Sequence, residues 1–192
     1  MTLTPTPPLA LTLAEYLRYD DGREQAYELE QGALRAMPPE SERNRRIAMK
    51  LLFWLGQQGV AMEQLSLKTD IVVAANTTRL PALMVLSPEL TIALSGASRS
   101  TVMPEMPAPD LVVEVVSPGS KNSQRDYETK RSEYAARGIP EYWIIDPQQQ
   151  QVVILHRVGE GYEAANFSGN ATIFSPCWGS LPFTAAQLWA TD

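Results

Sequence analysis

A valine-rich stretch that encloses a single glutamate constrains this chain more than any other feature. Leu111–Val116 reads Leu-Val-Val-Glu-Val-Val, and a β-branched run of this length predicts a buried strand. Glu114 has apolar neighbours on both sides, and burying an unpaired carboxylate is costly. We favour a metal site here, because buried carboxylates gather at functional sites. The simpler alternative is a strand-end glutamate paired with a surface cation.

A lysine follows this strand at a position from which it can reach the glutamate. Asp126, Lys130 and Tyr134 are spaced by four residues and therefore share one face of a predicted helix. If that helix packs back on the sheet, Lys130 approaches Glu114 and can orient a water molecule or stabilise charge at a phosphorus atom. Spacing alone favours the alternative, a surface pair between Asp126 and Lys130.

The remaining patterns predict an α/β (α+β) domain, a mixed sheet flanked by helices with an N-terminal β-hairpin. Residues 1–11 are expected to form a flexible tail and residues 12–192 a single domain. Segment 87–109, rich in proline, is predicted to be irregular, and 76–78 a turn. The predicted helices are 12–19, 41–58, 123–137 (capped by Ser123 with Asp126) and 184–190; the predicted strands are 26–30, 33–37, 64–68, 70–75, 80–86, 111–116, 141–146 and 152–156, with a weaker hairpin before the last helix.

Composition excludes several kinds of chemistry. The chain has 192 residues, a net charge of -6, one cysteine and one histidine. With one cysteine, an intramolecular disulfide and a cysteine-rich zinc site are impossible. With one histidine, we expect no Ser-His-Asp, Cys-His or multi-histidine centre, which leaves carboxylates, lysines, tyrosines and hydroxyls for catalysis. Cys177 is expected to be a small buried hydrophobe, and His156 has no assigned role. With neither a signal-peptide pattern nor a membrane-length apolar run, the protein is expected to be cytoplasmic.

Two motifs carry a family resemblance. Residues 109–118 read Pro-Asp-Leu-Val-Val-Glu-Val-Val-Ser-Pro, and residues 138–147 read Gly-Ile-Pro-Glu-Tyr-Trp-Ile-Ile-Asp-Pro. With Asp126, Lys130 and Tyr134 between them, they are similar to the signature of the Uma-two family of restriction-endonuclease-like proteins, in the PD-(D/E)XK nuclease superfamily. The upstream Tyr-Glu-Leu at 27–29 and Arg-Leu-Pro at 79–81 also resemble that family.

The resemblance implies a Mg²⁺-dependent endonuclease that acts on DNA. Glu114 matches the second metal-binding carboxylate, and Lys130 takes the role of the lysine that helps to activate water. The family's first aspartate falls at Ala82, which cannot bind a metal. Either another carboxylate, Glu28 or Asp70, takes its place, or the protein has kept the fold and lost cutting activity.

Three functions therefore compete. The first is a Mg²⁺-dependent endonuclease with Glu114, Lys130 and Glu28 at its centre. The second is an inactive nuclease-fold module that binds nucleic acid or protein, and the third is a structural partner in an oligomer. We expect a homo-oligomer, such as a dimer, and no membrane partner. Arg43, Arg45 and Arg46 could contact a phosphate backbone, although a solvated helix face is the commoner explanation for them.

Overall fold

A computed structural model of the 192-residue chain describes residues 9–190. The strands are β1 (Tyr27–Glu30), β2 (Ala33–Ala36), β3 (Leu65–Ser66), β4 (Asp70–Ala74), β5 (Thr77–Arg79), β6 (Leu83–Val85), β7 (Thr101–Val102), β8 (Leu111–Val115), β9 (Glu141–Asp146), β10 (Gln151–Val158), β11 (Gly161–Ser168), β12 (Thr172–Ser175) and β13 (Gly179–Thr184). The helices are α1 (Leu13–Tyr16), α2 (Glu42–Gln57), α3 (Pro88–Leu94), α4 (Ser120–Gln124), α5 (Lys130–Ala136) and α6 (Ala185–Trp189), with a 3₁₀ turn η1 (Met62–Gln64) and a π-helical turn η2 (Arg125–Thr129).

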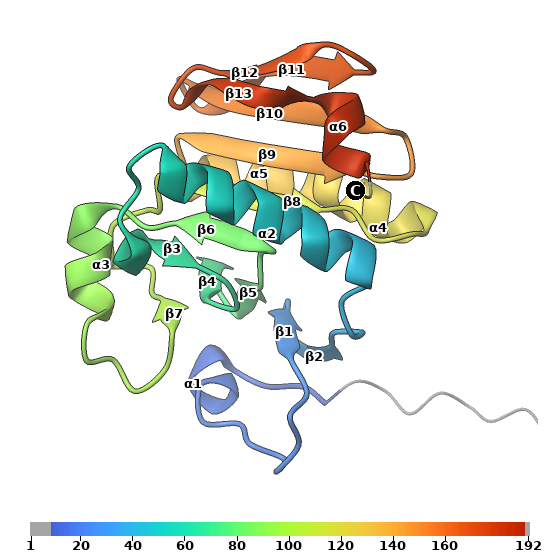
Figure 1. Cartoon of the computed structure of the whole chain (residues 1–192). Coiled ribbons are helices and arrows are strands. Elements are labelled where there is room, and N and C mark those ends of the chain that lie inside the picture. The colour runs from blue at the N-terminus through green and yellow to red at the C-terminus, as the bar shows by residue number, and fades with distance from the viewer. Residues whose placement is uncertain (1–8, 191–192) are drawn as a thin grey trace, which may run out of the picture.

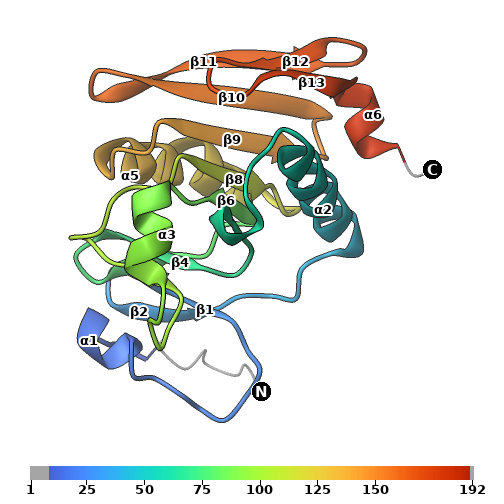
Figure 2. The same ribbon diagram turned by 60° about the vertical axis from the view of Figure 1, so that its left-hand side comes forward.

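A six-stranded mixed sheet forms the centre of the molecule, in the order β11-β10-β9-β8-β6-β3. Strands β8 and β9 run parallel and the other neighbours are antiparallel. Parallel neighbours need a crossover, which α4, η2 and α5 supply. Figures 1 and 2 show α2 and α5 on opposite sides of β8 and β9.

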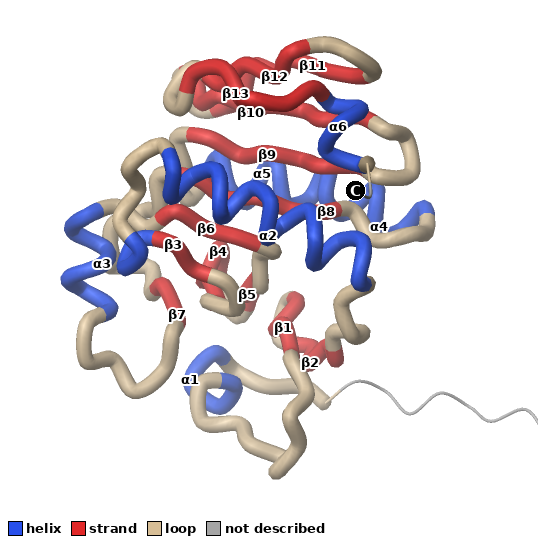
Figure 3. The backbone as a smooth tube through the Cα atoms, in the orientation of Figure 1, coloured by secondary structure: helices blue, strands red, loops and turns tan. Residues whose placement is uncertain are grey.

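Three smaller sheets surround the central one. The hairpin β1–β2 lies near α1 at the far end from β10–β13, as the strand colouring of Figure 3 makes clear. Strands β5, β4 and β7 form a second sheet, and β12 pairs with β13. The hairpin β1–β2 is joined to β5 by a hydrogen bond from the Leu29 amide to Thr78 Oγ1 (2.9 Å).

Strand β8 is buried on both faces, which explains its nearly continuous apolar sequence. Leu111, Val113 and Val115 pack in the core cluster that contains α2. Val112 and Val116 pack in the other cluster, with Tyr134 of α5. Side chains alternate along a strand, so Glu114 points to the same side as Val112 and Val116 and faces α5.

Capping patterns predicted two helix starts correctly. The Thr12 hydroxyl accepts a hydrogen bond from the Glu15 amide while the Glu15 carboxylate accepts one from the Thr12 amide, which completes a capping box. Ser41 caps α2 through the Asn44 amide (3.1 Å). The expected mixed α+β architecture is confirmed, with helices on both faces of the central sheet.

Three local predictions were wrong. Segment 80–86 holds only the short strand β6, because Pro81, which lacks an N–H donor, separates it from β5 in another sheet. Thr77 and Thr78 belong to β5 and not to a turn. The segment 87–109 contains α3 and β7, since Ser87 caps α3 and Pro88 occupies its first turn, where proline is tolerated.

The crossover helix also begins earlier than predicted. Its first residue is Ser120, after Gly119 with a φ of 116°, so Ser123 lies inside α4 and is not a cap. Of the expected N-terminal tail, residues 1–8 lie outside the described residues, while Leu9 and Leu11 exchange backbone hydrogen bonds with Leu34 and Gly32. Within residues 9–190, none of the helices has both the length and the apolarity needed to cross a membrane.

Packing of α2 on the sheet gives a first prediction. Leu51 is fully buried, whereas Phe53 on the same helix is 67% exposed. Leu51→Ala should lower the free energy of unfolding by about 2–5 kcal/mol, because it removes buried contacts and leaves a cavity. The matched control Phe53→Ala should change it by less than about 1 kcal/mol. Urea unfolding followed by circular dichroism measures both, and equal losses would show that α2 does not pack as described.

Candidate active site

Glu114 is a buried carboxylate that accepts two hydrogen bonds on one oxygen. It is 6% exposed and lies near the end of β8, opposite Ile144 of β9. Its Oε1 atom accepts hydrogen bonds from Lys130 Nζ (2.6 Å) and from the Tyr134 hydroxyl (2.8 Å). Among residues 9–190, no donor hydrogen-bonds its Oε2 atom, which leaves that oxygen for another ligand.

Lys130 is a buried ammonium surrounded by three carboxylates. It is 1% exposed, and its Nζ lies 2.6 Å from Glu114 Oε1, 3.4 Å from Asp126 Oδ1 and 3.9 Å from Glu28 Oε1. Asp126 is itself 1% exposed, so the interpretation of Asp126 and Lys130 as a surface pair is wrong. The structure brings Glu114, Lys130 and Glu28 together, although they come from three separate elements.

The π-helical turn η2 sets the position of this lysine. It covers Arg125–Thr129 and ends immediately before Lys130. Such turns are rare and occur frequently at functional sites, because the extra residue changes where the following side chains point. The Asp126 carbonyl accepts a hydrogen bond from the Tyr142 hydroxyl (2.8 Å), which anchors the turn on β9.

Glu28 joins the cluster from the N-terminal hairpin. It is 2% exposed, and its Oε1 accepts a hydrogen bond from the Leu80 amide (2.9 Å). Its Oε2 lies 3.4 Å from Arg79 Nη1. Arg79 also donates two hydrogen bonds of 2.7 Å to Glu133 of α5, a bidentate arrangement typical of strong arginine–carboxylate pairs.

Arg79 is the residue of this cluster that the sequence reading did not assign. It is 1% exposed and connects β5 both to the hairpin and to α5. The sequence did mark this residue, because Arg79 is the first residue of the Arg-Leu-Pro motif that precedes Ala82. Nothing in that motif, however, identifies the carboxylates that the guanidinium meets.

Ala82 and Asp70 are placed differently. The last pair of β6 with β8 is Leu83–Val113, so Ala82 lies one residue beyond the paired strand, and it packs against the core cluster that contains α2. Asp70 instead pairs with Arg99 Nη2 (2.8 Å) and the Tyr16 hydroxyl (3.1 Å), away from Lys130.

A cavity of about 730 Å³ lies elsewhere, and Glu114, Lys130 and Glu28 are not among its lining residues. Ala82, Asp70 and Arg99 are among its lining residues, together with Asn44 of α2. The Asn44 side chain is buried and donates a hydrogen bond to the Val115 carbonyl (3.4 Å), at the end of the Glu114 strand. The cavity is large enough for a small ligand or for a flipped-out part of a chain.

The α2 arginines take no part in the cluster. Arg45 and Arg46 both pair with Glu42 at 2.8 and 2.9 Å, and all three side chains are more than half exposed. Arg43 donates a hydrogen bond to the Pro147 carbonyl (3.0 Å). These contacts are those of a solvated helix face.

Burial dominates the electrostatics of the cluster. It raises the pKa of Glu114 to about 7, with Asp126 and Glu28 adding to the shift and Lys130 opposing it. Burial works against a charged Lys130, but Glu114, Glu28 and Asp126 outweigh it and raise the pKa of the amine. Burial also disfavours the charged form of Glu28, yet Lys130, the Leu80 amide and Arg79 hold its pKa below the ordinary value.

The donor set fits one hard divalent cation held weakly. Mg²⁺ takes oxygen ligands and commonly keeps several waters while binding one or two carboxylates. Glu114 Oε2 accepts no hydrogen bond from the described residues, and Glu28 Oε1 lies 3.9 Å from the same ammonium. Ala82 contributes no side-chain oxygen.

Comparison with known proteins gives one family and one fold. Residues 13–180 match the model of the Uma2 family, which is described as "Putative restriction endonuclease". A crystal structure of "a putative nuclease belonging to DUF820" from Anabaena variabilis ATCC 29413 has a TM-score of 0.72 at 19% identity, covering 93% of this chain and 97% of that one. No curated protein matches. The likeness confirms a nuclease-type fold.

Removing the ammonium tests the charge balance of the cluster. Lys130→Met should lower the free energy of unfolding by about 3–5 kcal/mol, because it leaves buried carboxylates without their shared cation. Lys121→Met, on the exposed part of the same crossover, should change it by less than about 0.5 kcal/mol. Urea unfolding compares the two variants, and a Lys130→Met protein as stable as wild type would contradict the ion-pair cluster.

The raised pKa of Glu114 gives a pH-dependent prediction. The folded state binds this proton more tightly than the unfolded state, whose glutamate has the ordinary pKa of 4.5. The stabilisation is complete below pH 4.5 and is lost as the pH rises through about 7. Wild type should therefore lose stability across this window relative to Glu114→Gln, which does not titrate. Urea unfolding of both proteins at intervals across the window measures this, and a constant difference would argue against it.

Proposed function

The chain belongs to the Uma2 family, and from that premise we propose that it is a Mg²⁺-dependent endonuclease that hydrolyses phosphodiester bonds in DNA. The observation that carries the proposal is the convergence of Glu114 and Lys130, with 2.6 Å between Oε1 and Nζ. A buried carboxylate and a buried amine in direct contact are groups that this reaction can use.

Glu114 is the proposed metal ligand, through its Oε2 atom. A bound Mg²⁺ would supply Lewis-acid stabilisation of the phosphoryl oxygens. Because Tyr134 and Lys130 both hold Oε1, the carboxylate is fixed in one orientation before a substrate arrives. Such preorganisation limits the rearrangement needed during the reaction.

Lys130 is proposed to act as a cation and not as a base. Its raised pKa keeps it protonated at neutral pH, so it donates hydrogen bonds. It can orient the attacking water and stabilise the negative charge that builds up on the phosphate as the water attacks. The proton that the water loses passes to solvent, because Lys130 and Tyr134 hold Glu114 Oε1 and the proposed metal takes Oε2.

Glu28 is the proposed substitute for the carboxylate missing at Ala82. Its Oε1 lies 3.9 Å from Lys130 Nζ and accepts a hydrogen bond from the amide of Leu80, which is two residues before Ala82 in the chain. We propose DNA as the partner and a homo-oligomer, in its simplest form a dimer, as the assembly. Because the protein has a net charge of -6, DNA would have to bind to a local basic surface on it.

Ala82 supports a second candidate function. A family member that lacks one metal-binding carboxylate and holds its ammonium among three others can keep the fold without the reaction. In that case the protein is an inactive module that binds nucleic acid or another protein.

Nicking of supercoiled plasmid distinguishes the two. With Mg²⁺ or Mn²⁺, wild type should cut at least about 100-fold faster than Glu114→Gln, because the metal ligand is lost. Glu128→Ala, which changes an exposed carboxylate on η2, should cut at the wild-type rate. Equal background rates for wild type and Glu114→Gln would exclude the nuclease, and retention of uncut DNA in a gel-shift assay would then support the binding module.

A further inference from the structure

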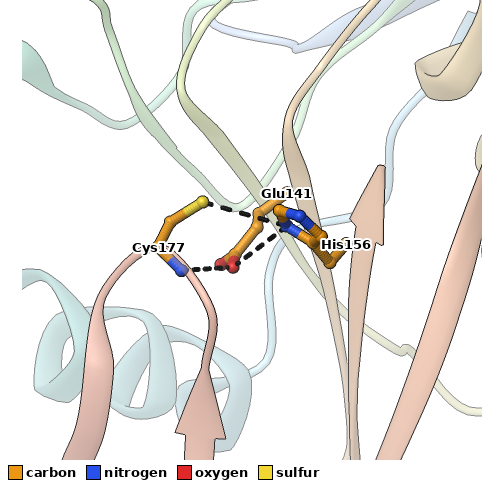
Figure 4. A group of neighbouring side chains, drawn as sticks. All are labelled: Glu141, His156 and Cys177. Atoms are coloured by element: carbon orange, nitrogen blue, oxygen red, sulfur yellow. Dashed lines mark hydrogen bonds and ion pairs between the residues drawn. The ribbon is translucent and has the colours of Figure 1, made fainter. Parts of the chain in front are cut away.

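The only histidine and the only cysteine of the chain lie side by side with a buried glutamate. His156 Nδ1 is 3.9 Å from Cys177 Sγ and 3.8 Å from Glu141 Oε1 (Figure 4). Glu141 comes from β9 and His156 from β10, while Cys177 lies in the connection between β12 and β13. Cys177 is exposed, so the expectation of a small buried hydrophobe is wrong.

We propose that Glu141, His156 and Cys177 form a second metal site, selective for Zn²⁺ and unrelated to the Glu114 cluster. One ligand atom from each residue lies within 4.8 Å of the other two. Tetrahedral zinc with ordinary bond lengths separates sulfur, nitrogen and oxygen ligands by about 3.4–3.6 Å. The measured distances of 3.8 and 3.9 Å exceed this by only a few tenths of an ångström, which small side-chain rotations remove.

The carboxylate is already oriented for a ligand. Glu141 Oε2 accepts hydrogen bonds from Trp143 Nε1 (2.8 Å) and from the Ser175 hydroxyl (2.7 Å). Oε1 accepts one from the Cys177 amide (2.9 Å), and Ser175 has a single proton to give. A carboxylate has about four lone-pair positions, so one remains, on the Oε1 atom that faces His156. Hydrogen bonds of this kind orient metal-binding carboxylates.

The donor set selects the ion. One thiolate sulfur, one imidazole nitrogen and one carboxylate oxygen suit Zn²⁺, whereas Mg²⁺ and Ca²⁺ prefer oxygen alone. Binding forms one metal–sulfur bond, and the Cys177 thiol releases one proton to the solvent without any redox change. Because His156 and Cys177 reach the surface, a water molecule can take the fourth position.

The site lies away from the Glu114 cluster. Glu141 pairs with Leu111 and Glu114 with Ile144, which separates the two sites by three residues along adjacent strands, or about 10 Å. A metal at Glu141, His156 and Cys177 would tie β9 and β10 to the β12–β13 connection. Its expected effect is therefore to stabilise the C-terminal part of the fold, whatever the activity at Glu114.

Cobalt titration under a non-thiol reductant tests the proposal. Wild type should bind one equivalent of Co²⁺ with a thiolate-to-cobalt charge-transfer band, and Zn²⁺ should displace it. Cys177→Ala should lose the band, and His156→Ala should bind at least about 100-fold more weakly. The matched control is Glu163→Gln, an exposed carboxylate directly across from His156 on β11, and it should behave as wild type.

Two results would overturn the site. These are the absence of a charge-transfer band in wild type, or a band of equal strength in Cys177→Ala. Circular dichroism establishes that each variant is folded before titration, and Zn²⁺ should raise the melting temperature of wild type but not of Cys177→Ala. Glu114→Gln should bind cobalt as wild type does, which separates this test from that of the nuclease.

Discussion

The ion pair between Glu114 and Lys130 joins the central strand of the sheet to the helix that crosses behind it. Removing two charges from water is costly, and their attraction repays the cost only when the geometry is good and the remaining lone pairs are satisfied. Here the contact is 2.6 Å and Tyr134 supplies a further hydrogen bond to the same oxygen. Strand β8, turn η2 and helix α5 must all hold their relative positions for this pair to exist.

The same cation connects the N-terminal hairpin to the sheet. Glu28 of β1 meets Lys130 at 3.9 Å and Arg79 at 3.4 Å, and Arg79 in turn holds Glu133 of α5. Residues from five elements, β1, β5, β8, η2 and α5, thus share a network in which each of these charges has an opposite neighbour. In the proposed nuclease, the same ammonium would also stabilise negative charge on a phosphate.

Ala82 is the point at which the protein departs from that chemistry. It stands at the position that matches the family's first aspartate, one residue before β6, and offers no oxygen to a metal. The network compensates in charge through Glu28 and Asp126, both of which approach Lys130 from other directions. In an active nuclease, an oxygen of Glu28 or Asp126 would have to bind the metal. In an inactive relative, these oxygens would pair only with Lys130.

Much of the fold could be predicted from local patterns. The valine run at 111–116, the Thr12 capping box and the four-residue spacing of Asp126, Lys130 and Tyr134 are local signals, and each reflects a geometric rule. Other features depend on contacts distant in sequence.

Arg79 meets Glu133 across 54 residues, and no local pattern indicates that pair. No local sequence pattern predicted the π-helical turn η2. Helix α3 was also not predicted, because a proline usually indicates a helix break, although Pro88 lies in the first turn of that helix. The cluster of Glu141, His156 and Cys177 assembles from three elements and was missed for the same reason.

Calorimetric titration with Mg²⁺ tests the central claim most directly. If Glu114 and position 82 face one metal site, Ala82→Asp should bind Mg²⁺ at least about tenfold tighter than wild type, since a second carboxylate joins the shell. That gain should vanish when Glu114→Gln is added. No gain from Ala82→Asp, or a gain that persists without Glu114, would contradict the account.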